Sequence, residues 1–194
     1  MGIASPWQAL RQQPMALKEW AAVVGALVAG QQVLVLRKGG IAEAGFAVKA
    51  RQFYLMPTRF HQTAEKLRSE AEGFLDLEVS SGVSMEAIAR VEDVFEVADG
   101  ATLEELAPHT PLSVEELRRR YTLRPDQALF GLLLRVHRLE RAFTLPWHKS
   151  YGGCRSWVPL REPPDLSVGV AALSDRAFFE AAQLVRVAAG VSGP

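Results

Sequence analysis

Short runs rich in Val, Leu and aromatic residues recur along this chain, each closed by glycine or proline, with helix-like segments between them. Runs of this length and composition are typical of β-strands. The sequence shows no internal repeat, low-complexity tract or long linker. We therefore expect a single α+β domain over residues 1–194, with a mixed, mostly antiparallel sheet or small barrel and peripheral helices.

The pattern predicts individual elements. Residues 1–14 are expected to form a short helix or arm that ends at Pro14, and residues 165–194 a C-terminal helical appendage capped by Ser174. The run "AAVVGALVAG", followed by "QQVLVL", favours a hairpin of two strands, because the Ala-Gly corner precedes a Val/Leu run. Further strands are expected at 51–58, 89–97, 128–143 and 156–160, and two short helical turns at 102–121.

The composition excludes several classes of protein. With 48% hydrophobic and 23% charged residues the chain is typical of a globular domain. Its longest apolar run is shorter than the roughly 20 residues of a membrane span, and no basic segment leads an apolar signal, so we expect a cytoplasmic protein with no membrane partner. The single cysteine can form neither an internal disulfide nor a Cys-based zinc site. The sequence leaves the cofactor and the oligomeric state open.

The net charge is zero, but the charges are unevenly distributed. Residues 1–64 carry seven Lys or Arg against two acids, residues 65–105 twelve acids against three bases, and residues 115–161 ten bases against four acids. Two basic segments separated by an acidic one favour a nucleic-acid or nucleotide partner. Mixed solvated faces explain the same pattern without a partner.

The first candidate motif is "RKGGI", where a strand-like run ends in Arg37 and Lys38. The amides of Gly39 and Gly40 can turn outward as an anion nest, to which Lys38 adds a positive charge, so the motif predicts a phosphate site. It lacks the spacing of a nucleotide P-loop. The alternative is an ordinary glycine turn.

The second motif is "PTRFHQ". Thr58 is expected to cap a helix that ends at Gly73, which would place Arg59, His61 and Gln62 on a first turn that favours anions. His61 could bind phosphate or act as an acid or base, since its ordinary pKa is about 6.5. Alternatively, it is simply exposed.

The third motif is "PWHKSYGGCRSWVPL". Trp147, Tyr151 and Trp157 are candidates for base stacking, and Lys149 and Arg155 for phosphate binding, with His148 beside them. Cys154 is a candidate nucleophile if a neighbouring cation lowers its pKa, or else a packing residue. No triplet of carboxylates with a lysine suits a Mg²⁺-dependent nuclease, so no metal site is predicted.

The chain resembles an uncharacterised bacterial family, the domain of unknown function 1802, in four blocks: "LKEWAAVVGALVAGQQVLVLRKGGI", "FYLMPTRFHQ", "ARVEDVFEV" and "YGGCRSWVPL". The resemblance implies a link to nucleic-acid processing, because some members of the family are found alongside restriction-endonuclease-type domains. The order of the elements is also similar to that of the small barrels related to pseudouridine synthase and archaeosine transglycosylase.

These observations together predict a nucleic-acid- or nucleotide-recognition module, accessory to DNA or RNA processing or to restriction. One alternative is an enzyme that acts on a phosphorylated small molecule or nucleic acid, with His61 as acid or base. Another is a protein-interaction module whose acidic segment binds a basic partner. If the motifs form one site, Lys38, His61 and either Cys154 or Trp157 should line one concave surface.

Overall fold

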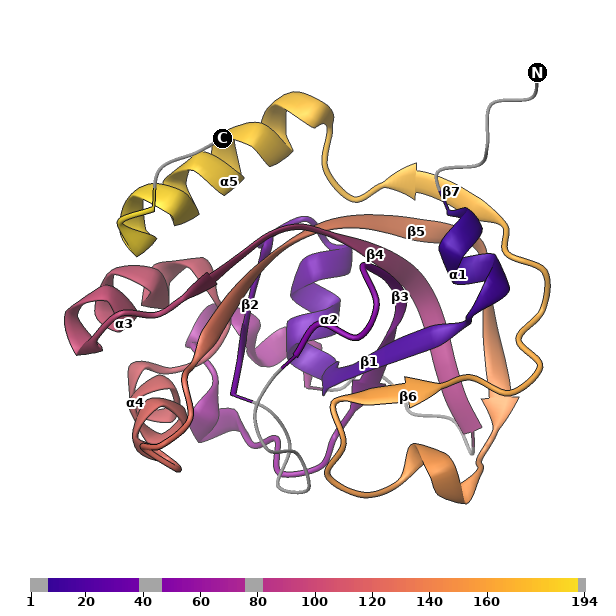
Figure 1. Cartoon of the computed structure of the whole chain (residues 1–194), viewed down its shortest axis with the longest axis horizontal. Helices are drawn as coiled ribbons and strands as arrows, with labels where there is room; N and C mark the ends of the chain where they lie inside the picture. The colour runs from indigo at the N-terminus through magenta and orange to yellow at the C-terminus, as the bar shows by residue number, and fades with distance from the viewer. Residues whose placement is uncertain (1–6, 39–46, 76–81, 192–194) are drawn as a thin grey trace.

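A curled seven-stranded sheet forms the body of the molecule (Figure 1). The computed structural model describes residues 7–38, 47–75 and 82–191. The strand order is β2-β5-β4-β3-β1-β6, and β7 pairs with β5 off this path. Only the pairing of β1 with β3 is parallel among these described strands. The predicted α+β domain with a mixed, mostly antiparallel sheet is therefore confirmed.

The elements have the following bounds. The strands are β1 (Met15–Trp20), β2 (Leu34–Arg37), β3 (Gln52–Thr58), β4 (Gly82–Glu96), β5 (Phe130–Pro146), β6 (Trp157–Pro159) and β7 (Val168–Ala171). The α-helices are α1 (Gln8–Gln12), α2 (Ala21–Val28), α3 (Gly100–Leu106), α4 (Val114–Thr122) and α5 (Asp175–Ala189). The 3-10 helices are η1 (Ala64–Lys66), η2 (Ser69–Phe74), η3 (Ala107–His109) and η4 (Lys149–Tyr151).

The sheet separates two hydrophobic cores because consecutive strand residues face opposite sides. Leu17 of β1 and its parallel partner Leu55 of β3 face the larger core, which includes α2. Their neighbours Ala16 and Tyr54 face the smaller core, together with Trp7 before α1. Figure 1 shows α2 within the curl of the sheet, where it covers one face of the central strands. The smaller core covers the other face.

The long pair β4 and β5 gives the sheet much of its curl. Its register shifts between Met85 and Ala87 and again between Val91 and Asp93. Such irregularities bend a strand and increase its twist. The two strands are therefore long enough and bent enough to pass around α2.

The predicted hairpin at residues 21–36 is wrong in its first half, because residues 21–28 form helix α2. All of its residues from Ala21 to Leu27 are buried, so the segment lacks the polar face that would identify a helix from its sequence. The second half, β2, is a strand as predicted.

The predicted helix after Thr58 is also wrong. Thr58 is the last residue of β3, and the following segment forms a turn and the 3-10 helices η1 and η2. His61 has a left-handed backbone with φ of 64°. Leu67 pairs with Leu112 in an isolated bridge, which holds the segment in a non-helical path despite its good helix formers.

Most other expected elements are present, including the strands at β3, β4, β5 and β6. Ser113 caps α4 by accepting a bond from the Glu116 amide at 3.3 Å, and Ser174 caps α5 by accepting one from the Ala177 amide at 3.2 Å. Helix α5 lies beside α3 (Figure 1). No helix in the described ranges combines the length and apolar character needed to cross a membrane.

Candidate functional site

Side chains join the two edge strands of the path at one end of the curled sheet. Arg37, at the end of β2, donates to the buried Glu19 carboxylate of β1 at 2.8 Å and to the Ser156 hydroxyl just before β6 at 2.7 Å. Glu19 is 2% exposed and also accepts from the Trp20 amide at 2.8 Å. This cluster of Glu19, Arg37 and Ser156, called here the closure cluster, joins β2 to β1 and to the start of β6, between which the described strands form no backbone ladder.

The first motif therefore contributes to the fold. Arg37 belongs to the closure cluster. The Lys38 ammonium donates to the backbone carbonyl of Tyr121 in α4 and lies 5.6 Å from the centre of the Tyr121 ring. Burial lowers the pKa of Lys38, and the charge of Asp126 partly opposes this. Lys38 thus contacts α4 and does not point into a shared site with the third motif. The predicted nest of Gly39 and Gly40 lies outside the described residues.

The second motif caps a helix from outside rather than starting one. The Gln62 side-chain oxygen accepts from the Ala22 amide at 2.9 Å, in the first turn of α2. The side chain of Gln62 therefore occupies the N-terminus of α2, a position at which an anion could otherwise bind. Arg59 and His61 are exposed in the preceding turn. With no helix there, the expected dipole at Thr58 and His61 is absent, which removes the main reason for assigning them to an anion site.

Only one of the three predicted stacking residues is at the surface. Trp157 is 4% exposed, packs edge-on against Phe53 and donates its ring N–H to the Ala47 carbonyl at 2.8 Å. Tyr151 is 2% exposed, and its hydroxyl accepts from the Arg161 amide at 3.0 Å. Neither ring presents an open face to a base. Trp147 is 56% exposed and keeps its candidate role.

The other residues of the third motif lie on a well-anchored loop, residues 147–156. His148 accepts from the Ser150 amide at 3.1 Å, while the Lys18 ammonium donates to the carbonyls of Tyr151 at 3.0 Å and Gly153 at 2.5 Å. Lys149, Cys154 and Arg155 are exposed on this loop. The burial expected of a packing cysteine is therefore wrong for Cys154. The loop presents its two cations to solvent from a fixed backbone.

The motifs meet only in part. Arg37 of the first touches Ser156 of the third, whereas Lys38 faces α4 and Trp157 is buried. Sequence reasoning missed Glu19, Lys18 and Ser156, which link β1 to β2 and to the loop. One signal could have found Glu19, since it is one of only two acids among the first 64 residues. No described group of three or more His, Cys, Asp and Glu residues could hold a metal ion.

A second charge pattern is clear once the strands are paired. Residues 44–64 and 141–161 contain no Asp or Glu. In the structure the two stretches adjoin, because Trp157 donates to Ala47 and β1 pairs with both β3 and β6. Their seven cations, called here the basic surface, are all exposed: Lys49, Arg51, Arg59, Arg141, Lys149, Arg155 and Arg161.

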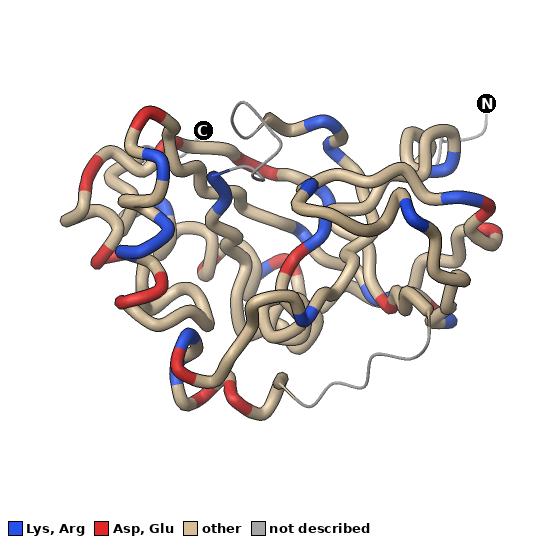
Figure 2. The backbone as a smooth tube through the Cα atoms, turned by 90° about the horizontal axis from the view of Figure 1, so that it is seen from below, with Lys and Arg blue, Asp and Glu red and all other residues tan. Residues whose placement is uncertain are grey.

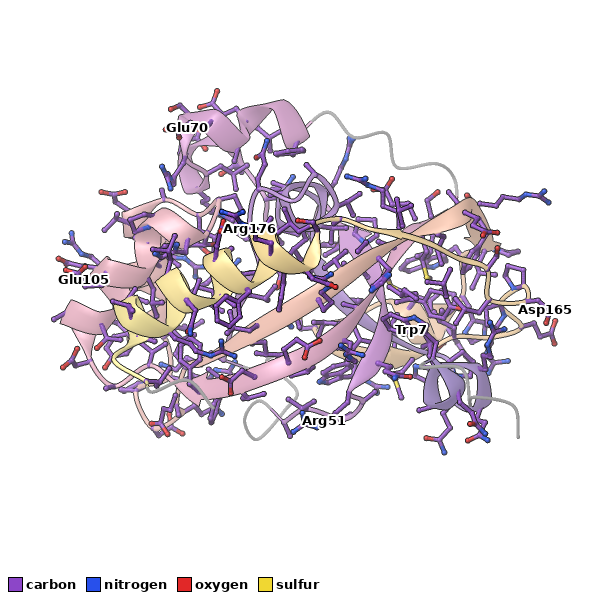
Figure 3. All side chains as sticks on the ribbon, turned by 90° about the horizontal axis from the view of Figure 1, so that it is seen from above. Trp7, Arg51, Glu70, Glu105, Asp165 and Arg176 are labelled. Carbon is purple, nitrogen blue, oxygen red and sulfur yellow. The ribbon has the colours of Figure 1, made fainter. Side chains whose placement is uncertain are left out.

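The basic surface is separate from much of the acidic segment. Figure 2, in which the molecule is seen from below, shows Lys and Arg interspersed with Asp and Glu around α3 and α4. In Figure 3, Arg51 and Glu70 of η2 project from opposite edges of the molecule. In the described part of the chain, Lys49, Arg51, Arg141, Lys149, Arg155 and Arg161 form no salt bridge with an acid. These six charges are therefore available to an anionic partner.

A family of known sequences matches residues 16–183, and its description is "Domain of unknown function (DUF1802)". The chain belongs to this family. The match confirms the resemblance in the four sequence blocks and covers the closure cluster and the basic surface. No curated protein matches the chain.

Similar solved structures include ASCH from Zymomonas mobilis, at 16% identity and a TM-score of 0.47, covering 78% of this chain and 90% of that one. A variant of the same protein has 15% identity, a TM-score of 0.47 and coverages of 77% and 91%. Another variant has 14% identity and a TM-score of 0.42, and the match covers 90% of this chain and 97% of that one. This likeness is too distant to support any inference about function. None of these three proteins is named as a pseudouridine-synthase-like barrel, and that finer description of the fold stays a prediction.

Proposed function

We propose that the chain is a nucleic-acid-binding module that holds phosphates on the basic surface. The observation that carries the proposal is that two acid-free stretches, distant in sequence, adjoin and expose seven cations. Each phosphate that such a cation neutralises releases condensed counterions, which drives binding without any need for base contacts. A small barrel related to pseudouridine synthase and archaeosine transglycosylase remains our proposed description of the fold at finer detail.

This proposal differs from the sequence prediction in its residues. Lys149 and Arg155 are kept, and Arg59 remains a candidate. Arg141 and Arg161 are added from the second acid-free stretch, and Lys49 and Arg51 from the first, because the Trp157 bond places their segment beside the loop. Arg37, Lys38 and Gln62 are assigned to the fold instead, because their side chains bond to Glu19, Tyr121 and Ala22 respectively.

Salt dependence tests the proposal. For about four phosphate contacts on a single strand, the slope of log K against log salt is roughly −3, which is about a 50-fold loss between about 50 and 200 mM salt. We expect fluorescence anisotropy with labelled oligonucleotides to show this loss. The double variant Lys149→Glu/Arg155→Glu should weaken binding by more than tenfold and flatten the slope by one unit or more.

The control has the same change of net charge elsewhere. Arg118 of α4 and Arg176 of α5 have exposed side chains, 58% and 89%, outside the basic surface. The variant Arg118→Glu/Arg176→Glu should stay within about threefold of the parent if binding is local. Equal loss in both double variants, or no binding of RNA or DNA at about 50 mM salt, would contradict the proposal and favour the small-molecule enzyme.

A further inference from the structure

Trp147 differs from the other three tryptophans of the chain in its exposure. Trp7, Trp20 and Trp157 are 5%, 8% and 4% exposed and belong to the cores, whereas Trp147 is 56% exposed. A large aromatic ring exposed to this extent gains less from burial than the three rings in the cores. Its position beside two cations of the basic surface therefore calls for an explanation.

The indole of Trp147 is supported on one side by its own loop. Its ring lies 6.3 Å from the centre of the buried Tyr151 ring at 79°, an edge-to-face arrangement. A Cβ added to Gly152 would lie 3.4 Å from the indole carbon Cζ2, so the ring rests close to that residue. The loop backbone is fixed by Lys18 and by the Tyr151 hydroxyl. The indole is thus held in place before any ligand arrives.

We infer that the basic surface binds a single strand, and that Trp147 is the platform on which one of its bases stacks; this inference rests on the proposed function. An exposed aromatic ring beside cations is the usual arrangement for single strands, because every base has a face that can stack. In a duplex the bases are already stacked on one another and offer no free face.

The secondary structure of the surface also favours a single strand. The described parts of the two acid-free stretches consist of strands, turns and 3-10 helix, with no α-helix. The described part of this surface therefore offers no α-helix to enter the major groove of a duplex. Lys149 and Arg155 are exposed on the same loop as the platform, so they can hold phosphates of a strand whose base stacks there. RNA and DNA single strands share this chemistry.

Competition between strands tests the inference directly. We would measure the anisotropy of a labelled 12-mer as single-stranded RNA, as single-stranded DNA and as the matching blunt duplex, at about 50 mM salt. The single strands should bind at least tenfold more tightly than the duplex. Tryptophan emission should be quenched on binding, and Trp147→Phe should abolish that quenching because the other three indoles are buried.

Substitution separates the platform from the charge. Trp147→Ala should weaken single-strand binding by about 5- to 150-fold with an unchanged salt slope, and Trp147→Phe should restore part of the loss. The control is Phe179→Ala, which removes a ring 60% exposed on α5 and should have no effect. A duplex bound as tightly as the single strands, or Trp147→Ala within twofold of the parent, would overturn the inference and leave the proposed function intact. Absence of binding to all three probes would refute the proposed function itself.

Discussion

The closure cluster predicts a large and specific loss of stability when Arg37 is replaced. Glu19 is 2% exposed, so Arg37→Met leaves a buried carboxylate without its charge partner. Breaking a buried ion pair in this way costs about 3–5 kcal/mol, against a total stability of roughly 5–15 kcal/mol for a domain. For a chain of this size, that loss lowers Tm by about 6–20 °C.

Unfolding by urea, followed by tryptophan fluorescence and circular dichroism, measures the effect. The double variant Glu19→Leu/Arg37→Met removes both charges and should recover much of the loss, since an apolar pair of similar size is often tolerated in such a position. Ser156→Ala removes one hydrogen bond to a charged group and should cost about 1.5–3 kcal/mol. A cost below about 1 kcal/mol for Arg37→Met, or a double variant at least as unstable as it, would refute this role of the cluster.

Three further outcomes are expected. Cys154→Ser should change the free energy of unfolding by no more than about 0.5 kcal/mol in chemical denaturation, because the thiol is exposed. Burial lowers the pKa of His109 and His137 below their ordinary 6.5, so the unfolded chain binds more protons than the folded one. The contribution of these histidines to stability should therefore be complete above about pH 6.5 and be lost as the pH decreases through their pKa values in the folded protein. The variant His137→Gln should lose less stability over this pH range. Lys18→Met should speed amide hydrogen exchange in residues 147–156 by tenfold or more, while exchange in α5 stays unchanged.

The strands were predictable where burial was one-sided or the turn residues were clear. In β4 buried residues alternate with more exposed ones over much of the strand, and the sequence shows this, whereas β3 is a continuous apolar run followed by Pro57. α2 was not predictable by the same means, because it is buried on all sides by the curl of the sheet. An apolar run of this length fits a strand and a buried helix equally well, and only the tertiary structure decides between them.

The candidate site was harder to predict because it depends on long-range contacts. Arg37 bonds to Glu19 and Ser156, which are 18 and 119 positions away from it in the sequence. The sequence around Arg37 therefore suggested a phosphate site, although its charge is already paired within the fold. The exposure of an aromatic ring also depends on the tertiary structure. Trp147 and Trp157 flank the same loop, yet one is at the surface and the other in the core. The segregation of charge along the chain was visible, and pairing of the strands converts it into a surface.

Adjacent residues at the end of β1 link the stability of the fold to the shape of the surface. Glu19 continues the face of Leu17 and belongs to the closure cluster, whereas Lys18 lies on the other face and holds the loop of Trp147. The two effects should therefore be separable. Arg37→Met should lower stability while the folded fraction keeps its affinity, because the loop is still held by Lys18. Lys18→Met should weaken binding of single strands while it lowers stability less than Arg37→Met, because it leaves no buried carboxylate without a partner and because a mobile platform must be ordered again each time it binds.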